Sequence, residues 1–386
     1  MRQRENILEE YLQWCRAVLL PFWLKHGIDT KHGGFFETLH MSANANREST
    51  RRVRVASRQV YSFSHGHHLQ WIEAKRQILN GVDWLMDRAW AKDGEPGFLH
   101  IVDDNSQPLD HTRDLYDHAF HILGLSWAYR ATKDAQILSV AEQAWYFIED
   151  TLAAKNGGWY ENLQQTQIRR QNPHMHMFEA LLSMFEVTKD TAYLIRADDI
   201  AQLLLERFID QKSGYLFEEF NNNWTAMTPA RIEPGHMMEW TWLLHQRAQI
   251  PAKTATTSCQ INFLQHGENL GRQENGLLID SCDPNGDISQ HSSRLWVQCE
   301  WLKALLTSND QSQNLDQKAN DLCERLFTYF INQDHPALWM DAVSKNNQPL
   351  SNRVPASIVY HLVSAAAQVE QFLSQPQTLE SSCPSL

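Results

Sequence analysis

Histidine and acidic side chains stand at the start of several apolar, helix-like segments. In EPGHMMEWTWLL (233–244), the pair Pro234-Gly235 marks a turn, and His236 and Glu239 then fall one helical turn apart. A carboxylate in that place can set the tautomer and basicity of a histidine, so the pair predicts a general base. The alternative is a capped helix start whose histidine is only hydrogen-bonded.

A second stretch, NPHMHMFEA (172–180), places two histidines two residues apart. A proline near a helix start fixes how the chain enters it, and residues two apart then lie on different faces. At most one of His174 and His176 should therefore face a given cavity. The two histidines, like His236 and Glu239, are metal-ligand types. Because HxH projects two ways and HxxE supplies only two ligands, we predict no metal site.

Two further polar residues lie inside apolar segments, where a polar side chain must be paired, hydrogen-bonded or in contact with a ligand. Arg58 lies in RVRVASRQVYSFSHG (52–66), and it is costly on an inner helix unless it is paired or faces a ligand. His361 is alone in VPASIVYHLVSAA (354–366), where a packed core histidine is the usual interpretation. Candidate partners open two other helices, namely Tyr116, Asp117 and His118 in 113–129, and Trp296 and Glu300 in 294–306.

The familiar cofactor and nucleophile motifs are absent. The sequence has no P-loop, no GxGxxG after a strand, no GxSxG and no HExxH. We therefore expect chemistry by histidines and acids without a bound cofactor.

Composition narrows the class of protein. The 386-residue chain is 42% hydrophobic and 21% charged, as in soluble globular proteins, and its net charge of −12 argues against nucleic acid as a partner. It shows no signal-peptide layout and no run of 18 apolar residues, so neither secretion nor a membrane span is expected. The six cysteines are scattered without CxxC, which favours a reduced, cytoplasmic chain.

A short phrase recurs with a period near sixty residues. It consists of a small residue, two or three apolar or aromatic residues, and a polar one, and it reads as a short hairpin or extended turn. Its markers are 63, 61, 56, 62 and 61 residues apart, at Gly34, Gly97, Gly158, Gly214, Gly276 and Ala337.

Helical periodicity fills the segments between the phrases. Segments 116–132 and 134–153 form one expected pair of helices, and 175–189 and 190–209 form the next. Thr-Lys-Asp stands at the break in both pairs, which indicates a tight antiparallel connection.

Helix pairs cannot bury their apolar faces alone, so the units must stack, either as an open solenoid or as a closed ring. Six units suit a closed ring. We expect an all-α (α/α)6 barrel of about twelve helices, with short β-hairpins and the active site at one end. It would form one domain over 1–373, followed by a polar, disordered tail over 374–386.

The stretches NPHMHMFEALL, EPGHMMEWTWLL, RQVYSF, LYDHAF and VYHL together resemble the N-acylglucosamine 2-epimerase superfamily. That group includes cellobiose 2-epimerases and aldose–ketose isomerases acting on mannose, and the resemblance runs from about residue 20 to 370. It implies the same barrel and a small sugar as substrate. It also implies that Arg58, His176, His236, Glu239 and His361 belong to the site, with His174 in a structural place.

The resemblance also suggests roles. His361 would take the proton from carbon 2 of an open-chain sugar, and His236, oriented by Glu239, would assist ring opening and transfer at the oxygens. The two roles could be exchanged. Arg58 would stabilise the cis-enediolate, and His176 would contact the substrate. From their places near the starts of helices, we expect Tyr116, His118, Trp296 and Glu300 to contact the substrate as well.

The wording of segments 51–66 and 114–120 is closer to the mannose isomerase branch, so we expect interconversion of free D-mannose and D-fructose by a monomer or homodimer. A sugar 2-epimerase is the alternative. A glycoside hydrolase would need two carboxylates across the cleft, for which Glu239, Glu300 and Asp117 are candidates. A non-catalytic sugar-binding protein is the remaining alternative.

Overall fold

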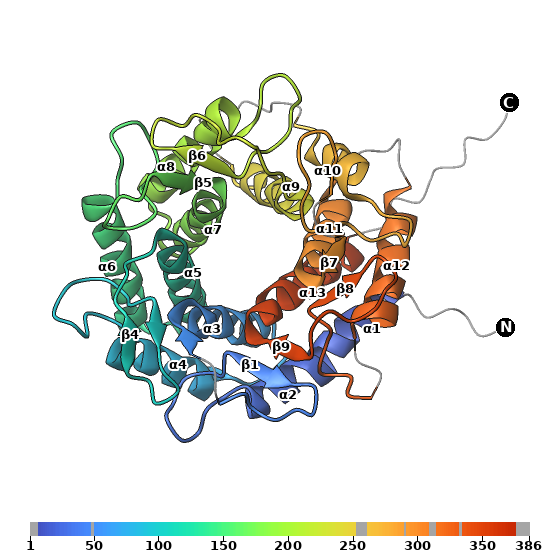
Figure 1. Ribbon diagram of the computed structural model, residues 1–386. Helices are drawn as coiled ribbons and strands as arrows, with labels where there is room; N and C mark the ends of the chain where they lie inside the picture. Colours follow the sequence, from blue (N-terminus) through green and yellow to red (C-terminus); the bar gives the residue numbers. More distant parts are fainter. Residues whose placement is uncertain are drawn as a thin grey trace, which may run out of the picture.

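Two concentric rings of helices build the barrel. Figure 1 shows the computed structural model, which describes residues 7–47, 50–251, 261–288, 291–308, 314–331 and 334–375. The inner ring consists of α3 (Val53–His68), α5 (Leu115–Thr132), α7 (Gln171–Thr188), α9 (Pro234–Ala248), α11 (Leu295–Thr307) and α13 (Val359–Leu373). The outer ring consists of α1 (Ile7–Trp14) continued through a π turn by α2 (Leu20–His26), then α4 (Lys75–Arg88), α6 (Ala135–Thr151), α8 (Thr191–Leu203), α10 (Phe263–Gly271) and α12 (Leu315–Arg325). The predicted (α/α)6 barrel is confirmed.

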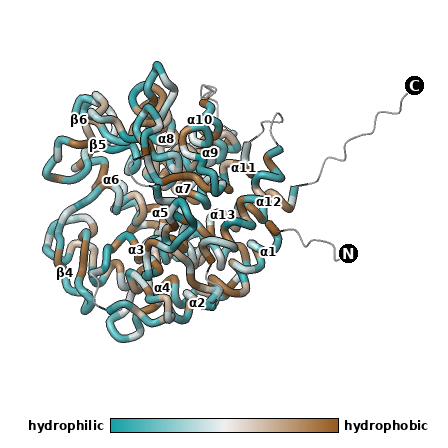
Figure 2. Tube along the Cα trace, turned by 45° about the vertical axis from the view of Figure 1, so that its right-hand side comes forward, coloured by the Kyte–Doolittle hydropathy of each residue, from teal (hydrophilic) through white to brown (hydrophobic). Residues whose placement is uncertain are grey.

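The ring closes through its last and first inner helices. Helix α13 packs against α3, and α1 packs against α12 and α13 on the outside. The inner helices are apolar nearly all round, as helices enclosed by others must be, and in α11 all 13 residues are buried. The loops that carry β4, β5 and β6 are mostly hydrophilic (Figure 2).

The Thr-Lys-Asp breaks form the tight connections expected of them. Lys133 and Lys189 adopt the left-handed conformation at the ends of α5 and α7, each with φ near 61°. The side chains of Asp134 and Asp190 then cap α6 and α8 by accepting a backbone N–H.

Short strands link neighbouring units at one end of the barrel. They are β1 (Thr38–His40), β2 (Arg51–Arg52), β3 (Ile101–Val102), β4 (Pro108–Asp110), β5 (Ile168–Arg170), β6 (Glu219–Asn221), β7 (Ser292–Arg294), β8 (Ala342–Ser344) and β9 (Arg353–Pro355). The antiparallel pairs are β1–β9, β2–β3, β3–β4, β5–β6 and β7–β8. Each of β2, β5, β7 and β9 directly precedes an inner helix and pairs with the strand that follows the next outer helix, whereas β4 pairs with β3 just before it.

Each recurrent phrase also contacts the end of its own outer helix. In every unit one phrase residue bridges back to that end, as Phe35 does to Ile28 and Trp159 to Ala153. Two residues after each bridging residue stands the polar member of the phrase. These polar residues are Glu37, His100, Glu161, Glu218, Asp280 and Asp341.

Three other expectations concern the chain as a whole. No helix within the described ranges has the length and apolar character needed to cross a membrane. Cys15, Cys282, Cys299 and Cys323 are free and buried, whereas Cys259 and Cys383 lie outside the described residues. The tail predicted over 374–386 falls outside them from residue 376 onward and stays a prediction.

Candidate active site

Six side chains form a ring inside the barrel, because each inner helix contributes its sixth residue after the N-cap. The N-caps are Arg52, Asp114, Arg170, Glu233, Arg294 and, before the short 3-10 turn leading into α13, Pro355. The sixth residues are Arg58, Phe120, His176, Glu239, Glu300 and His361, and none is more than 7% exposed. The structural repeat therefore brings five of the predicted site residues to one level.

His361 on α13 is held by Glu300 on α11. Its Nδ1 lies 2.7 Å from Oε1 of Glu300, at hydrogen-bonding distance, and no group among the described residues bonds its Nε2. Burial lowers the pKa of His361 to about 4, although the Glu300 hydrogen bond acts in the opposite direction. His361 is therefore neutral near pH 7, with Nε2 available to accept a proton.

His236 on α9 has the opposite electrostatic environment. Its Nδ1 lies 2.9 Å from Oε2 of Glu218 and 3.6 Å from Oε2 of Glu233. Burial alone lowers the pKa of His236, but these two carboxylates outweigh it and raise the pKa to about 10. His236 is therefore a cation near pH 7, suited to donate a proton.

The prediction that Glu239 orients His236 is wrong. Glu239 lies one turn further along α9 but makes no hydrogen bond to His236, and its Oε1 lies 3.9 Å from Nδ1 of His176. The hydrogen-bonding carboxylate comes from the phrase between α8 and α9, since Glu218 directly precedes β6 and also accepts from the side chain of Gln171 on α7. Glu218 could have been noticed, because it is the polar member of its recurrent phrase.

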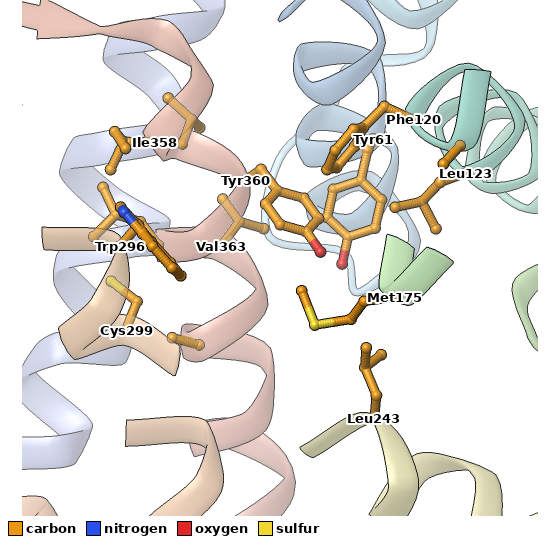
Figure 3. Close-up of a cluster of buried hydrophobic side chains, with 14 of the residues drawn as sticks. Tyr61, Phe120, Leu123, Met175, Leu243, Trp296, Cys299, Ile358, Tyr360 and Val363 are labelled. Carbon is orange, nitrogen blue, oxygen red and sulfur yellow. The ribbon is translucent and has the colours of Figure 1, made fainter. Parts of the chain in front are cut away.

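The two histidines of segment 172–180 separate as their spacing predicts. Nδ1 of His176 lies 3.3 Å from Oε2 of Glu179, inside the barrel. Tyr360 donates to the same carboxylate at 2.6 and 2.7 Å. Burial raises the pKa of Glu179 to about 7. In Figure 3 the ring of Tyr360 on α13 lies beside that of Tyr61 on α3, with both hydroxyl groups pointing toward Met175.

His118 is wrong as a substrate contact. Its Nδ1 donates to the carbonyl of Asp114, and its Nε2 accepts the N–H of Phe98 at 3.0 Å, so both nitrogens are used within a fully buried site. His174 makes the same pair of bonds one unit later, to Arg170 and Trp159. Gln298 occupies the matching place on α11 and binds Leu278 in the same way. These residues secure the phrase against the inner helix.

Arg58 lies on the opposite side of the ring from Glu239. Its Nη2 donates to the hydroxyl of Tyr116 over 2.6 Å, and its guanidinium stacks 3.9 Å from the ring centroid of Phe120. Arg58 has no carboxylate partner among the described residues, and it is 7% exposed. A buried guanidinium without an anion suits a developing oxyanion.

Trp296 lies against both of the contrasting histidines. Its ring centroid lies 5.2 Å from that of His236 and 5.6 Å from that of His361. Gly235 makes room for it, because a Cβ there would come within 2.7 Å of the indole. An indole at this place offers an apolar face to a sugar ring.

The remaining predicted acids are occupied. Glu300 was expected to contact substrate, but its side chain is fully buried behind His361 and next to Lys303, so that expectation is wrong. Asp117 accepts from Arg54 at 2.7 Å and from His100 at 2.6 Å. Neither carboxylate is free to act across a cleft as a glycosidase pair requires.

Several possible ligand atoms for a cation come together. The triplets His176–Glu179–Glu239, Glu218–Glu233–His236 and Glu239–Glu300–His361 each lie within 4.8 Å. Three positive side chains already stand among them, those of Arg58, His236 and Lys303. We assign no metal to these groups.

Comparison with known proteins identifies the family of the chain. The family model for N-acylglucosamine 2-epimerase matches residues 34–365. The chain belongs to the N-acylglucosamine 2-epimerase family. It is therefore a sugar isomerase or epimerase, and its substrate is a small sugar.

Individual members of the family differ in their named activity. The chain is 28% identical to a mannose-6-phosphate isomerase from Rhizobium meliloti, over 95% of this chain and 97% of that one. It is 25% identical to a D-mannose isomerase from Marinomonas mediterranea, over 96% and 98%. A solved cellobiose 2-epimerase from Bacillus thermoamylovorans superimposes with a TM-score of 0.86 at 21% identity, over 94% of this chain and 99% of that chain.

Proposed function

We propose that the protein interconverts free D-mannose and D-fructose through a cis-enediolate. The observation that carries the proposal is the contrast between His361 and His236, which flank one indole and have pKa values of about 4 and about 10. Environments that separate two titratable groups in this way assign a base and an acid.

The reaction follows from this assignment. Nε2 of His361 removes the proton from carbon 2 of the open-chain aldose, and the electron pair moves toward the carbonyl oxygen. Arg58 stabilises the negative charge that develops there. His236 protonates the ring oxygen during ring opening and exchanges protons with the oxygens of carbons 1 and 2. Exchange of this proton with solvent, followed by return of a proton from His361 to carbon 1, gives the ketose.

A single neutral base favours isomerisation over epimerisation. Inversion of carbon 2 needs a base on each face of the enediolate, whereas transfer to carbon 1 on the same face needs one. Since its carboxylate partners hold His236 protonated near pH 7, it is a poor second base. His176 also has a pKa well below its usual value, because of burial and the nearby Arg58. Among the described residues, however, the indole of Trp296, on which we propose that the sugar lies, contacts the rings of His236 and His361 and not that of His176.

The charges at the mouth of the barrel favour a neutral sugar. Arg52 pairs with Glu37, Arg170 with Glu161 at 2.5 Å, and Arg231 with Glu233. Arg54 pairs with Asp117 at 2.7 Å. Because these guanidinium groups already have carboxylate partners, they are less available for a sugar phosphate.

Product analysis with a panel of sugars tests the proposal. We expect fructose from mannose, and a much lower kcat/KM with mannose 6-phosphate, glucose, cellobiose and N-acetylmannosamine. Conversion of cellobiose or N-acetylmannosamine to its carbon-2 epimer in place of ketose formation would identify an epimerase. Hydrolysis of aryl glycosides would contradict both, and binding of mannose without any product would leave a sugar-binding protein.

A further inference from the structure

The ammonium group of Lys303 is buried in the middle of the barrel. Its side chain on α11 has no solvent exposure, a rare environment for lysine. Nζ lies 2.6 Å from Oε2 of Glu300, one turn earlier on the same helix, and 3.6 Å from the ring centroid of Trp242 on α9. A charge in such a place is stable only with close partners, and these two provide them.

Glu300 bridges Lys303 and His361. One carboxylate oxygen accepts from Nδ1 of His361 at 2.7 Å, and the other faces the ammonium. The side chain of Glu300 is fully buried. The three residues therefore form a chain from Lys303 through Glu300 to the imidazole.

Other acidic side chains lie close to Lys303, Glu300 and His361, and the charge of Lys303 decides which of them is ionised. Burial raises the pKa of Glu239 well above its usual value, and the Glu300 charge raises it further. Burial acts in the same direction on Glu300, but Lys303 and His361 outweigh it and leave the pKa of Glu300 lowered. The titratable and charged groups facing these three residues are Arg58, Tyr61 and His65 of α3, His176 and Glu179 of α7, His236 and Glu239 of α9, Cys299 of α11, and Tyr360 of α13.

We propose that Lys303 is a positioning residue of the proposed reaction, whose ammonium keeps Glu300 ionised so that Glu300 holds His361 with Nδ1 as donor and Nε2 as acceptor. The inference rests on the proposed function. Without Lys303, a buried Glu300 beside Glu239 takes up a proton and can donate it to Nδ1. The imidazole then carries its proton on Nε2 and cannot accept one from carbon 2.

Replacement of Lys303 by an uncharged side chain of similar length tests the proposal. We expect Lys303→Met to lower kcat for mannose by roughly 10- to 100-fold with KM nearly unchanged, because Arg58, Tyr116 and Trp296 remain in place. The matched control is Lys318→Met, which removes an ammonium 2.7 Å from Glu268 on the outer helices and should leave kcat unchanged. A folded Lys303→Met protein with wild-type kcat would overturn the proposal.

Chemical rescue separates charge from space filling. A cavity of 470 Å³ at the end of the barrel opposite the strands is lined by Tyr61, Glu179 and Trp242, so small molecules can approach this level from there. n-Propylammonium has the three carbons and the nitrogen that Lys303→Ala removes. We expect it to restore kcat of that variant in a saturable manner, whereas 1-propanol should not. Equal rescue by both would mean that Lys303 only fills space, which would contradict the proposal.

The wild-type protein offers a test that depends on neither variant folding. NMR of protein labelled with ¹⁵N-histidine should report the Nδ1–H tautomer for His361 at pH 7, and the Nε2–H tautomer would overturn the inference. A wild-type protein that converts no sugar, yet shows the Nδ1–H tautomer, would refute the proposed function and leave the Lys303–Glu300–His361 chain standing.

Discussion

At the scale of single residues, each histidine of the site has a buried carboxylate on Nδ1. The pairs are His176 with Glu179, His236 with Glu218, and His361 with Glu300. Helical spacing predicted that only one of His174 and His176 faces the cavity, and the family resemblance then selected His176 together with His236 and His361. Their partners could not be predicted, since Glu218 lies in a phrase outside any helix, Glu300 lies on a different helix from His361, and only Glu179 shares a helix with its histidine. Lys303 was missed because a lysine in an apolar helix has no pattern that distinguishes it from a surface residue.

The charge of Glu218 should determine the alkaline side of the pH profile. In Glu218→Gln the pKa of His236 should fall, because burial lowers it and the principal opposing carboxylate is gone. The alkaline limb of kcat/KM, governed in the wild type by a pKa of about 10, should move toward neutral pH. The control is Glu219→Gln, which alters the neighbouring residue that faces Arg231 at 3.3 Å. Identical alkaline limbs in wild type and Glu218→Gln would exclude His236 as the acid.

His118 should matter for stability and not for turnover. His118→Leu leaves the carbonyl of Asp114 and the N–H of Phe98 without this partner, and we expect a loss of about 1–3 kcal/mol in the free energy of unfolding. His118→Gln should be tolerated better, because Gln298 fills the matching place on α11. Urea unfolding measures the difference. A folded His118→Leu protein with strongly reduced kcat would contradict this account and show that His118 acts in the reaction.

At the scale of elements, the recurrent phrase predicted the short strands, and the Thr-Lys-Asp breaks predicted the helix connections. Pairing across units was not predicted, because a phrase shows its own polarity but not which other unit lies beside it. That pairing explains why Glu218 reaches His236. The backbone N–H of Gln171 at the start of α7 donates to the carbonyl of Glu218, so the strand register fixes the carboxylate near α9.

Close approach of α3 and α5 should make Gly124 sensitive to substitution. A Cβ at Gly124 would lie 2.6 Å from the carbonyl oxygen of Ser57, a backbone atom that moves only with its helix. Gly124→Ala should therefore destabilise the protein by about 1–3 kcal/mol, the usual range for overpacking. At Gly267 on α10 the Cβ would meet the terminal methyl of Met238 at the same distance, which a rotation relieves. Equal unfolding midpoints for the two alanine variants would contradict this account of the packing.

At the scale of the whole molecule, closure of the ring is what makes the site. Glu300 and His361 belong to the fifth and sixth units and Arg58 to the first, and they meet because α13 packs against α3 and β9 pairs with β1. The six-unit repeat predicted closure. The repeat could not predict how many ionisable side chains are buried inside the barrel. Sequence periodicity shows which face of a helix is apolar, but it does not show how deeply a polar residue is buried.

This burial should make the protein sensitive to acid. Burial lowers the pKa of His65 and His174 to about 3 and that of His118 to about 4. In the unfolded chain these residues titrate near 6.5, so the unfolded state binds more protons as the pH falls below that value. The free energy of unfolding should therefore decrease steadily from pH 7 to pH 4. Denaturation at pH 7, 6 and 5 with unchanged midpoints would show that these histidines are not neutral in the folded protein.

The most direct test of the central claim is proton NMR of mannose incubated in deuterated water with the wild type and with His361→Asn in parallel. We predict fructose carrying deuterium at carbon 1 with the wild type, and a rate lower by about 10²- to 10⁴-fold with His361→Asn, the usual contribution of a general base. Deuterium at carbon 2 of an aldose with little ketose, or wild-type exchange in His361→Asn, would contradict a single-base isomerase acting through His361.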